Sequence, residues 1–265
     1  MKLNSLIKII EAIAPISLKE DFDNVGLMVG DRESKINKVL LALDCTLDVI
    51  EEAKNLEVDL ILTHHPLIFR KPSSITTDTL LGKKIIELIK NNINLYSAHT
   101  NWDSVKDGLN DTLVKILGFE NSKIISKNNL DNNCGIGRIV DLDSTIKLEN
   151  ILNNIRKTLK IEHLRYVGEL DKNIKKIAIV NGSGQDFFEV SKKLGADLII
   201  TGDTTYHYVS DYKEMGLSII DIGHFNSEWT VLQKVNEKVI EEINNKGENL
   251  TIFISKNSKD PYNFI

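Results

Sequence analysis

Two segments of the chain end an apolar run with the same histidine-based pattern. The segments INLYSAHTNWD and LSIIDIGHFNSE align so that His99 corresponds to His224 and Asp103 to Glu228. Imidazole nitrogens and carboxylate oxygens are donors that proteins use for divalent transition-metal ions. The repeated His-x-Asn-x-(Asp/Glu) pattern therefore makes residues of both segments candidate ligands of the same pair of metal ions.

A second pair of histidines, His64 and His65, follows the apolar segment LILT. Successive side chains of an extended chain point to opposite sides, so adjacent imidazoles suit two metal ions better than one. Histidines that only cover a strand end are the ordinary alternative, but the acids at strand ends elsewhere favour the metal. The predicted ligands of two divalent ions are three imidazoles and two carboxylates, namely His64, His65, Asp103, His224 and Glu228.

Other polar residues are candidates for supporting roles. His99 is a further ligand, a partner behind the ligands or a proton shuttle, and His207, in TGDTTYHYV, is a candidate general acid or base. Near the N-terminus, DNVG forms a turn before an edge strand, or a loop that presents Asp23 and Asn24 to a site. We predict catalytic roles for His99 and His207.

The two acids of the repeated pattern have an ordinary alternative use. An acid in the first turn of a helix is favoured by the helix dipole, and Ser227 or Asn226 can cap a helix that places Glu228 there. This reading explains the positions of Asp103 and Glu228. It does not explain the histidine that lies four residues before each of them.

The NGSG segment and the two cysteines are weaker indications of a functional site. Residues 181–184, NGSG, could cradle a phosphate, but they lack the lysine of a phosphate-binding loop, so a tight turn is the favoured use. Cys45 and Cys134 show no metal-type spacing and fit a reducing cytosol.

The elements that must position these residues also occur twice. Residues 38–65 align without a gap on residues 176–203, with nine of 28 positions identical, which indicates internal duplication. In both copies short apolar segments alternate with helical ones, as in α/β sheets with parallel neighbours, where functional groups collect beyond the carboxyl ends of strands. After an amphipathic N-terminal helix we predict strands at 38–44, 59–63, 93–98, 135–142, 163–169, 175–181, 197–201, 217–222 and 250–255, and helices at 48–55, 80–90, 103–117, 147–159, 187–194, 208–215 and 228–245.

The predicted architecture is two related α/β domains with mixed sheets flanked by helices. The first, residues 1–125, carries the paired histidines and the first His-x-Asn-x-Asp motif. The second, residues 126–265, carries the His-x-Asn-x-Glu motif, and its C-terminal helix is free to pack back on the first. The polar, aperiodic stretch 119–132 is the linker candidate.

Composition limits the partners. The 42% hydrophobic and 27% charged residues are typical of a soluble globular protein. A net charge of −5 without a basic stripe makes nucleic acid an unfavourable main partner. No apolar run approaches the ~18–20 residues that cross a bilayer, and Lys8 and Glu11 interrupt what would be the core of a signal peptide. We expect a cytoplasmic protein that does not enter membranes.

Five segments resemble motifs of the GTP cyclohydrolase I type 2 family, also called the NGG-interacting-factor-three-like family of dinuclear metal proteins. They are DNVGLMVGD, LTHHPLIF, AHTNWD, TGDTTYHYV and DIGHFNSE. The resemblance covers nearly the whole chain, in the family's compact form without a large middle insertion. It implies a two-domain α/β protomer, a toroidal homohexamer with metal sites facing its interior, and the metal-ligand role for the five residues named above.

The leading hypothesis is a hydrolase with two divalent ions, Zn, Fe or Mn, that lower the pKa of a water and so supply hydroxide near neutral pH. The resemblance points to a small-molecule substrate of nucleotide type, with GTP the first to test. The alternative is a non-catalytic metal-binding or scaffold hexamer, whose metal ligands would be the same. A ring that threads DNA is disfavoured by the acidic charge balance.

Overall fold

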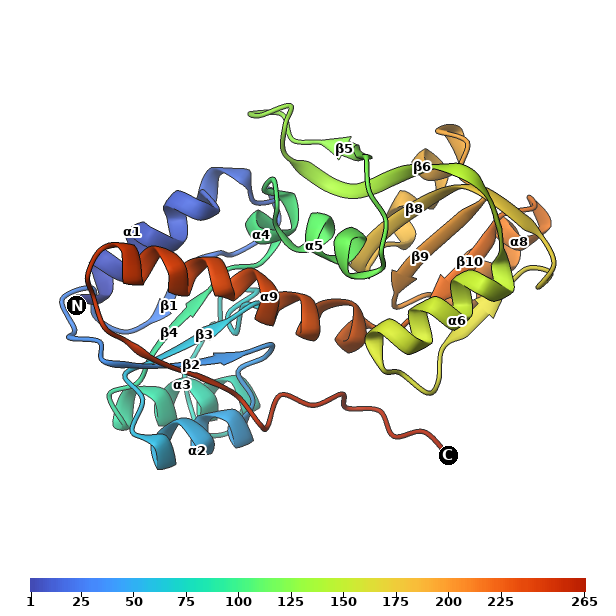
Figure 1. Ribbon diagram of the computed structural model, residues 1–265. Helices are drawn as coiled ribbons and strands as arrows, with labels where there is room; N and C mark the ends of the chain where they lie inside the picture. The colour runs from blue at the N-terminus through green and yellow to red at the C-terminus, as the bar shows by residue number, and fades with distance from the viewer. The chain divides into compact units, whose positions relative to one another are not determined.

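The computed structural model describes residues 1–265 and divides into two compact units. The first unit comprises residues 1–102 and 232–259, and the second comprises residues 103–231 and 260–265. Each unit contains one mixed sheet with helices on its faces, which confirms the predicted α/β class (Figure 1). The division along the chain falls at 102/103, where the sequence placed it at 125/126.

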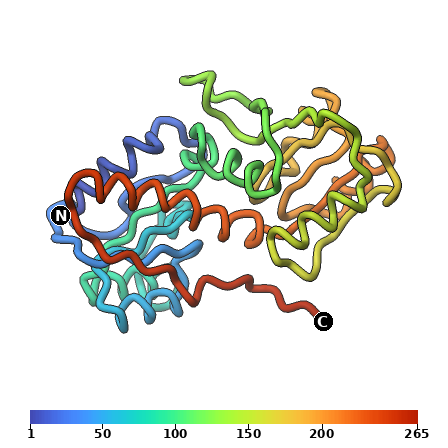
Figure 2. The backbone as a smooth tube through the Cα atoms, in the orientation of Figure 1, coloured from blue at the N-terminus to red at the C-terminus, as the bar shows by residue number.

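The sheet of the first unit has the strand order β1-β4-β3-β2-β11. Its parallel strands are β2 (Lys38–Ala42), β3 (Leu60–Thr63), β4 (Asn94–Ser97) and β11 (Thr251–Ile254), and β1 (Gly26–Val29) runs antiparallel to β4. The chain returns between parallel strands through α2 (Leu47–Leu56) and α3 (Leu80–Lys90) on one face (Figure 2). Helix α1 (Leu3–Ile13), followed by the short η1 (Ile16–Leu18), lies over the other face together with the part of α9 (His224–Asn245) that begins at Leu232.

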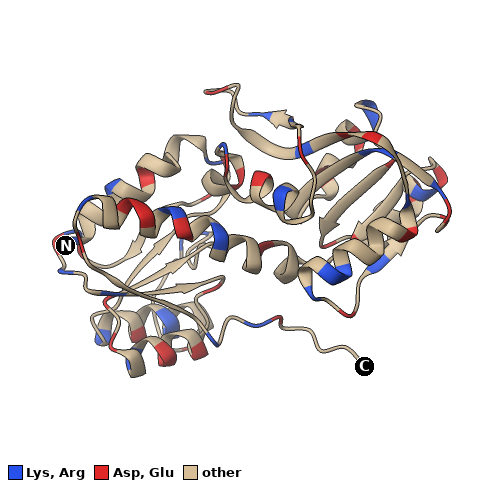
Figure 3. Cartoon of the chain, viewed as in Figure 1, with Lys and Arg blue, Asp and Glu red and all other residues tan.

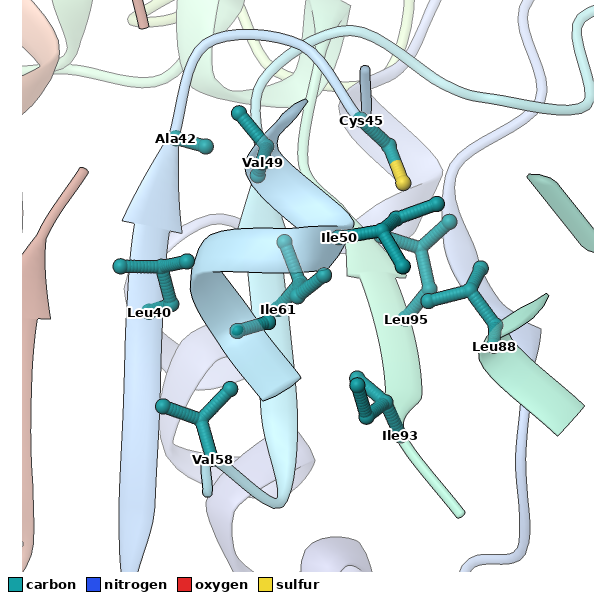
Figure 4. Close-up of a cluster of buried hydrophobic side chains, with 11 residues drawn as sticks. Leu40, Ala42, Cys45, Val49, Ile50, Val58, Ile61, Leu88, Ile93 and Leu95 are labelled. Carbon is teal, nitrogen blue, oxygen red and sulfur yellow. The ribbon is translucent and has the colours of Figure 1, made fainter. Parts of the chain in front are cut away.

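The core of the first unit forms where α2 packs on the strands. Thr46 caps α2 by accepting a hydrogen bond from the Val49 backbone N–H at 3.1 Å, which satisfies one of the free donors of the first turn. Val49 and Ile50 then contribute to a buried cluster with Leu40 and Ile61 (Figure 4). All four residues of β3 are buried, as expected for a parallel strand covered on both faces.

The sheet of the second unit has the order β5-β6-β8-β9-β10-β7. Its strands are β5 (Ser122–Lys127), β6 (Gly135–Lys147), β7 (Arg165–Val167), β8 (Asn173–Ser183), β9 (Leu198–Gly202) and β10 (Ser218–Asp221), of which β8, β9 and β10 are parallel neighbours. After η2 (Gln185–Phe187), α7 (Phe188–Lys193) and α8 (Tyr206–Glu214) pack on one face through Phe188 and Val209. Helix α5 (Leu109–Ile116) contacts β6 and β8, and α6 (Leu148–Leu159) contacts β6.

The two sheets repeat one topology, as the sequence duplication predicts. The unit β2-α2-β3-α3-β4 corresponds to β8-α7-β9-α8-β10, and an antiparallel strand flanks each, β1 beside β4 and β7 beside β10. An aspartate at equivalent positions of the two copies accepts the same pair of backbone hydrogen bonds. Asp59 accepts hydrogen bonds from the backbone N–H groups of residues 37 and 38, and Asp197 accepts them from residues 175 and 176.

Two predicted segments of the second unit differ from the observed ones. The helix expected at 103–117 is broken into α4 (Thr100–Ser104) and α5, because Asp107 adopts a left-handed φ of 58° and Gly108 begins a new helix. The linker candidate 119–132 contains β5, which pairs antiparallel with β6, so this stretch is part of the second sheet.

Charged residues lie mostly on the exposed faces of the helices and in loops. Lys and Arg are interspersed with Asp and Glu along these surfaces (Figure 3). None of the helices combines the length and apolar composition that crossing a bilayer requires.

Candidate metal centre

Three histidines of the first unit converge beyond the carboxyl ends of neighbouring strands. His64 and His65 follow β3, and His99 follows β4. Each offers one ring nitrogen, and these atoms all lie within 4.8 Å of one another. The ring centroids are 5.0 to 5.6 Å apart. We call these three residues the imidazole group.

The tautomer of His64 is fixed by the backbone of the adjacent strand. Its Nδ1 lies 2.9 Å from the carbonyl oxygen of Ala98, and because a carbonyl only accepts, Nδ1 carries the proton. In a neutral ring of this tautomer the lone pair is on Nε2, and neutral imidazole is the form that binds a metal ion. His64 is fully buried, so its orientation is held by packing as well.

The other two imidazoles are oriented by carboxylates. Asp44 accepts from the Nδ1 of His65 at 2.8 Å, and Asp23 accepts from the Nδ1 of His99 at 2.9 Å. Burial alone would raise the pKa of Asp23, but hydrogen bonds from His99 and Thr100 outweigh it and lower this pKa to about 2. The carboxylate of Asp23 is therefore ionised near neutral pH. A carboxylate behind a histidine is the usual partner that orients a metal ligand.

The second unit holds a histidine and a glutamate one helical turn apart. The Nε2 of His224 lies 3.0 Å from Oε2 of Glu228, and the Nδ1 of His224 lies 2.7 Å from Oδ2 of Asp203. We call His224 and Glu228 the His–Glu pair. Its imidazole has the same carboxylate support as His65 and His99.

Helix α9 begins at His224, four residues before the predicted start. Asn226 and Ser227 do not cap it, because the amide of Asn226 donates to the Ile222 carbonyl and the hydroxyl of Ser227 donates to the His224 carbonyl. Glu228 therefore lies in the second turn, on the same face as His224. The alternative use of Glu228 as a first-turn acid is wrong, and its partnership with His224 replaces it.

The NGSG segment lets β8 pass close to the His–Glu pair. A Cβ atom on Gly182 would lie 2.3 Å from Oε1 of Glu228, and the backbone there has a left-handed φ of +60°. Ser227 also accepts a hydrogen bond from the Gly182 backbone N–H at 2.9 Å. Residues 181–183 form the end of β8, so the tight-turn reading of this motif is wrong, and the left-handed Gly182 leaves room for the carboxylate of Glu228.

Asp103 lies in the first turn of α4 and is nearly buried. The side-chain amide of Asn181 donates to its Oδ1 at 2.7 Å, and the amide of Asn110 donates to its backbone carbonyl at 3.0 Å. One amide thus orients the carboxylate of Asp103, and the other holds its backbone.

His207 lies on the exposed first turn of α8, with its ring 5.4 Å from that of Tyr206. It belongs neither to the imidazole group nor to the His–Glu pair, and its catalytic role stays a prediction. His163 is exposed and stacks on Phe264.

Sequence reasoning missed two of the supporting carboxylates. Asp44 and Asp203 were not singled out, although Asp44 directly follows an apolar strand and Asp203 occupies the position of His65 in the repeat. The DNVG segment was interpreted either as a turn before an edge strand or as a loop that presents Asp23 and Asn24 to a site. The hydrogen bonds of Asp23 with His99 and Thr100 support the second interpretation.

The donors fit divalent transition-metal ions. The first unit offers three imidazoles with Nδ1 engaged, and the second offers an imidazole and a carboxylate on one helix face. Nitrogen and carboxylate donors without thiolates are typical of Zn, Fe or Mn sites. The sharing of ions between the two groups stays a prediction.

Comparison with known proteins identifies the family. Residues 1–261 match the family described as Duf34/NIF3 (NGG1p interacting factor 3). The chain belongs to this family. A GTP cyclohydrolase 1 type 2 homolog of Clostridium perfringens is 67% identical over 265 residues, with all of both chains covered. A protein of the same name from Clostridium acetobutylicum is 55% identical, over 100% of this chain and 99% of its own length.

Solved structures of other members share the fold. A Bacillus cereus protein related to NIF3 superimposes with a TM-score of 0.92 at 25% identity, covering 100% of this chain and 99% of that one. Reduced HcgD from Methanocaldococcus jannaschii superimposes with a TM-score of 0.82 at 34% identity, covering 97% and 98%. The resemblance noted from the five sequence motifs is confirmed.

Proposed function

We propose that this Duf34/NIF3 protein is a hydrolase that depends on two divalent metal ions. The proposed ligands are His64, His65, Asp103, His224 and Glu228, with Zn, Fe or Mn as the ions. The observation that carries the proposal is that the Ala98 carbonyl and Asp44 engage the Nδ1 atoms of His64 and His65, which makes Nε2 the donor nitrogen of each neutral ring.

When bound, the two ions would activate a water molecule for hydrolysis near neutral pH. The residues of the chain set the conditions for that chemistry. Asp44 and Asp203 hold the rings of His65 and His224 in one orientation. Glu228, on the face of α9 that carries His224, would supply a carboxylate ligand to the ions.

Two histidines are proposed to handle protons. The Nδ1 of His99 is linked to the carboxylate of Asp23, an arrangement that orients the imidazole for proton transfer. His207 is exposed on α8 and is free to meet a substrate from solvent. Their side chains are the first to replace once turnover is established.

The names of the relatives suggest a substrate class. GTP cyclohydrolase 1 type 2 homologs are 67% and 55% identical to this chain, so a purine nucleotide is the first substrate to test. We further propose a homohexameric ring, on the family resemblance, and a location in the cytoplasm.

The test compares Glu228→Gln with Glu237→Gln. Both changes remove one carboxylate charge from α9, but Glu237 is exposed and pairs with Lys234. Metal content and turnover of GTP and a phosphoester panel are measured with Mn, Fe or Zn. We expect Glu228→Gln to lose metal and at least about 100-fold of turnover, as the loss of a group that binds the reacting species implies, and Glu237→Gln to match wild type.

The outcomes separate the two candidate functions. Unchanged turnover in Glu228→Gln would reject the hydrolase. Metal that is bound by wild type and lost in Glu228→Gln, without turnover of any substrate, would favour the non-catalytic metal-binding hexamer instead. Mass measurement in solution tests the hexamer separately.

A further inference from the structure

A cleft of about 380 Å³ opens in the second unit between the edge strand β7 and helix α8. Its walls come from β7, from β10 and from the first two turns of α8. Two of its lining residues, Thr204 and Asp221, lie at the carboxyl ends of β9 and β10, the edge at which parallel α/β sheets bind ligands. Its volume suits a small molecule and not a folded partner.

The cleft shares its framework with the His–Glu pair. Asp221, at the end of β10, accepts hydrogen bonds from the backbone N–H groups of Gly223 and Thr204, both at 3.0 Å. His224 directly follows Gly223, and Thr204 directly follows Asp203, whose carboxylate orients His224. The loops that line the cleft therefore also position the proposed metal ligand His224.

Two tyrosines give the cleft exposed aromatic surface. Tyr206 is 80% exposed and Tyr166 is 45% exposed, and both line the cleft. Aromatic rings left open to solvent at the wall of a cleft are suited to stack on a flat ring. Stacking of this kind accepts any base, because every base has a π-face.

Two cations add an attraction for negative charge. Arg165 donates to the carboxylate of Asp221 and, at 3.4 Å, to the Thr204 carbonyl, both through Nη2. This fixes the guanidinium and leaves its other N–H groups facing a largely exposed environment. Lys213 lines the opposite wall from α8. With Asp221 already bonded to Arg165, the lining carries one excess positive charge.

We propose that this cleft binds a nucleotide, with its ring stacked on Tyr206 and its phosphates held by Arg165 and Lys213. The bound nucleotide is the substrate of the metal centre, and this part of the proposal rests on the proposed function. Binding itself does not require the metal. The cleft is thus a specificity site that presents the nucleotide to His224.

The test measures binding to the metal-stripped full chain by titration calorimetry. Three probes separate the two halves of the ligand: guanosine carries only the ring, tripolyphosphate only the charge, and GTP both. Tyr206→Leu removes the aromatic surface and Lys213→Gln removes one charge. The matched controls are Tyr208→Leu and Lys157→Gln, exposed residues of α8 and α6 outside the cleft.

We expect a crossed pattern. Tyr206→Leu weakens the binding of guanosine and GTP by about 5-fold or more, as loss of a base–aromatic stack implies. It leaves the affinity for tripolyphosphate unchanged. Lys213→Gln weakens the binding of tripolyphosphate and GTP by about 2- to 5-fold, the range expected for loss of an exposed ion pair. It leaves the affinity for guanosine unchanged. Both control variants behave as wild type.

Three results would overturn the proposal. They are the absence of GTP binding to the wild-type chain, equal GTP binding in Tyr206→Leu and wild type, and a change of assembly mass in Tyr206→Leu that marks the cleft as a contact between copies. Metal content, measured in parallel, separates these failures from failure of the proposed function. A chain that keeps its two metals but shows no crossed pattern retains the metal centre and loses only this site.

Discussion

Replacing Gly182 by alanine should displace a metal ligand without unfolding the protein. The added Cβ would lie 2.3 Å from Oε1 of Glu228, whereas ordinary contacts begin near 3.4 Å. The carboxylate must therefore move by about 1 Å, the difference between these distances. Metal–ligand distances tolerate only about 0.2 Å, so a shift of this size removes Glu228 from a productive position.

The cost to folding is separable from the cost to metal binding. Alanine at a left-handed φ of +60° is strained by about 1–2 kcal/mol. The Glu228 carboxylate is the flexible end of a side chain, so its movement adds little to this strain. Gly216 provides a matched control, because its φ is +79° and no atom lies within 4 Å of an added Cβ.

Two assays distinguish the effects. Urea unfolding in the presence of a chelator should show a loss of about 1–2 kcal/mol for both Gly182→Ala and Gly216→Ala, because both place alanine in the left-handed region. Competition against a chelator of known affinity should show metal binding weakened about 10- to 100-fold in Gly182→Ala, the range for a disturbed ligand shell. Gly216→Ala should bind metal as wild type does.

Equal metal affinity in the two glycine variants would refute this reasoning. It would mean that the carboxylate of Glu228 does not need the space beside Gly182. The same result would weaken the assignment of Glu228 as a metal ligand.

Three further predictions follow from individual side chains. The pKa of Asp23 is lowered to about 2, so this carboxylate stabilises the fold above its unfolded pKa, and the contribution is lost as pH falls from about 4 to 2. Asp23→Asn should therefore lower the free energy of unfolding by about 2 kcal/mol at pH 7. In urea unfolding of the metal-free protein, the variant should lose less stability than wild type over this acidic range. Ile61 is fully buried in the cluster under α2, so Ile61→Ala should cost about 2–5 kcal/mol in the same unfolding assay, and a cost below 1 kcal/mol would contradict that packing. Burial raises the pKa of the Cys45 thiol to about 12, so Cys45 should resist a thiol reagent at pH 8 until denaturant is added, and modification of the native chain at this residue would show that the cluster opens.

Local pattern was enough to predict the repeated part of the fold. The helix Leu80–Lys90 was placed at its observed ends, and the parallel strands of both copies were found within a few residues, because buried apolar segments and amphipathic helices leave regular signals. The break before α5 had a local signal too, since Asp107-Gly108 is a turn-forming pair that the helical spacing of its neighbours concealed. Strand β5 was missed because it is a half-exposed edge strand with few apolar residues.

The contacts that orient the histidines could not be predicted from local sequence patterns. His99 and Asp23 are 76 positions apart, and His224 and Asp203 are 21 apart, so each pair exists only once the sheet has formed. The start of α9 was misplaced for a related reason. Ser227 and Asn226 are residue types that often cap helices, but Ser227 bonds to Gly182 of β8 and Asn226 donates back to the Ile222 carbonyl.

Anomalous scattering from crystals of the metal-loaded protein, recorded at the absorption edge of the bound metal, tests the central claim most directly. The account predicts two ions per chain, with His64, His65, Asp103, His224 and Glu228 as ligands at about 2.0–2.2 Å. Ions bound to the imidazole group without His224 and Glu228, or a chain that takes up no metal, would contradict it.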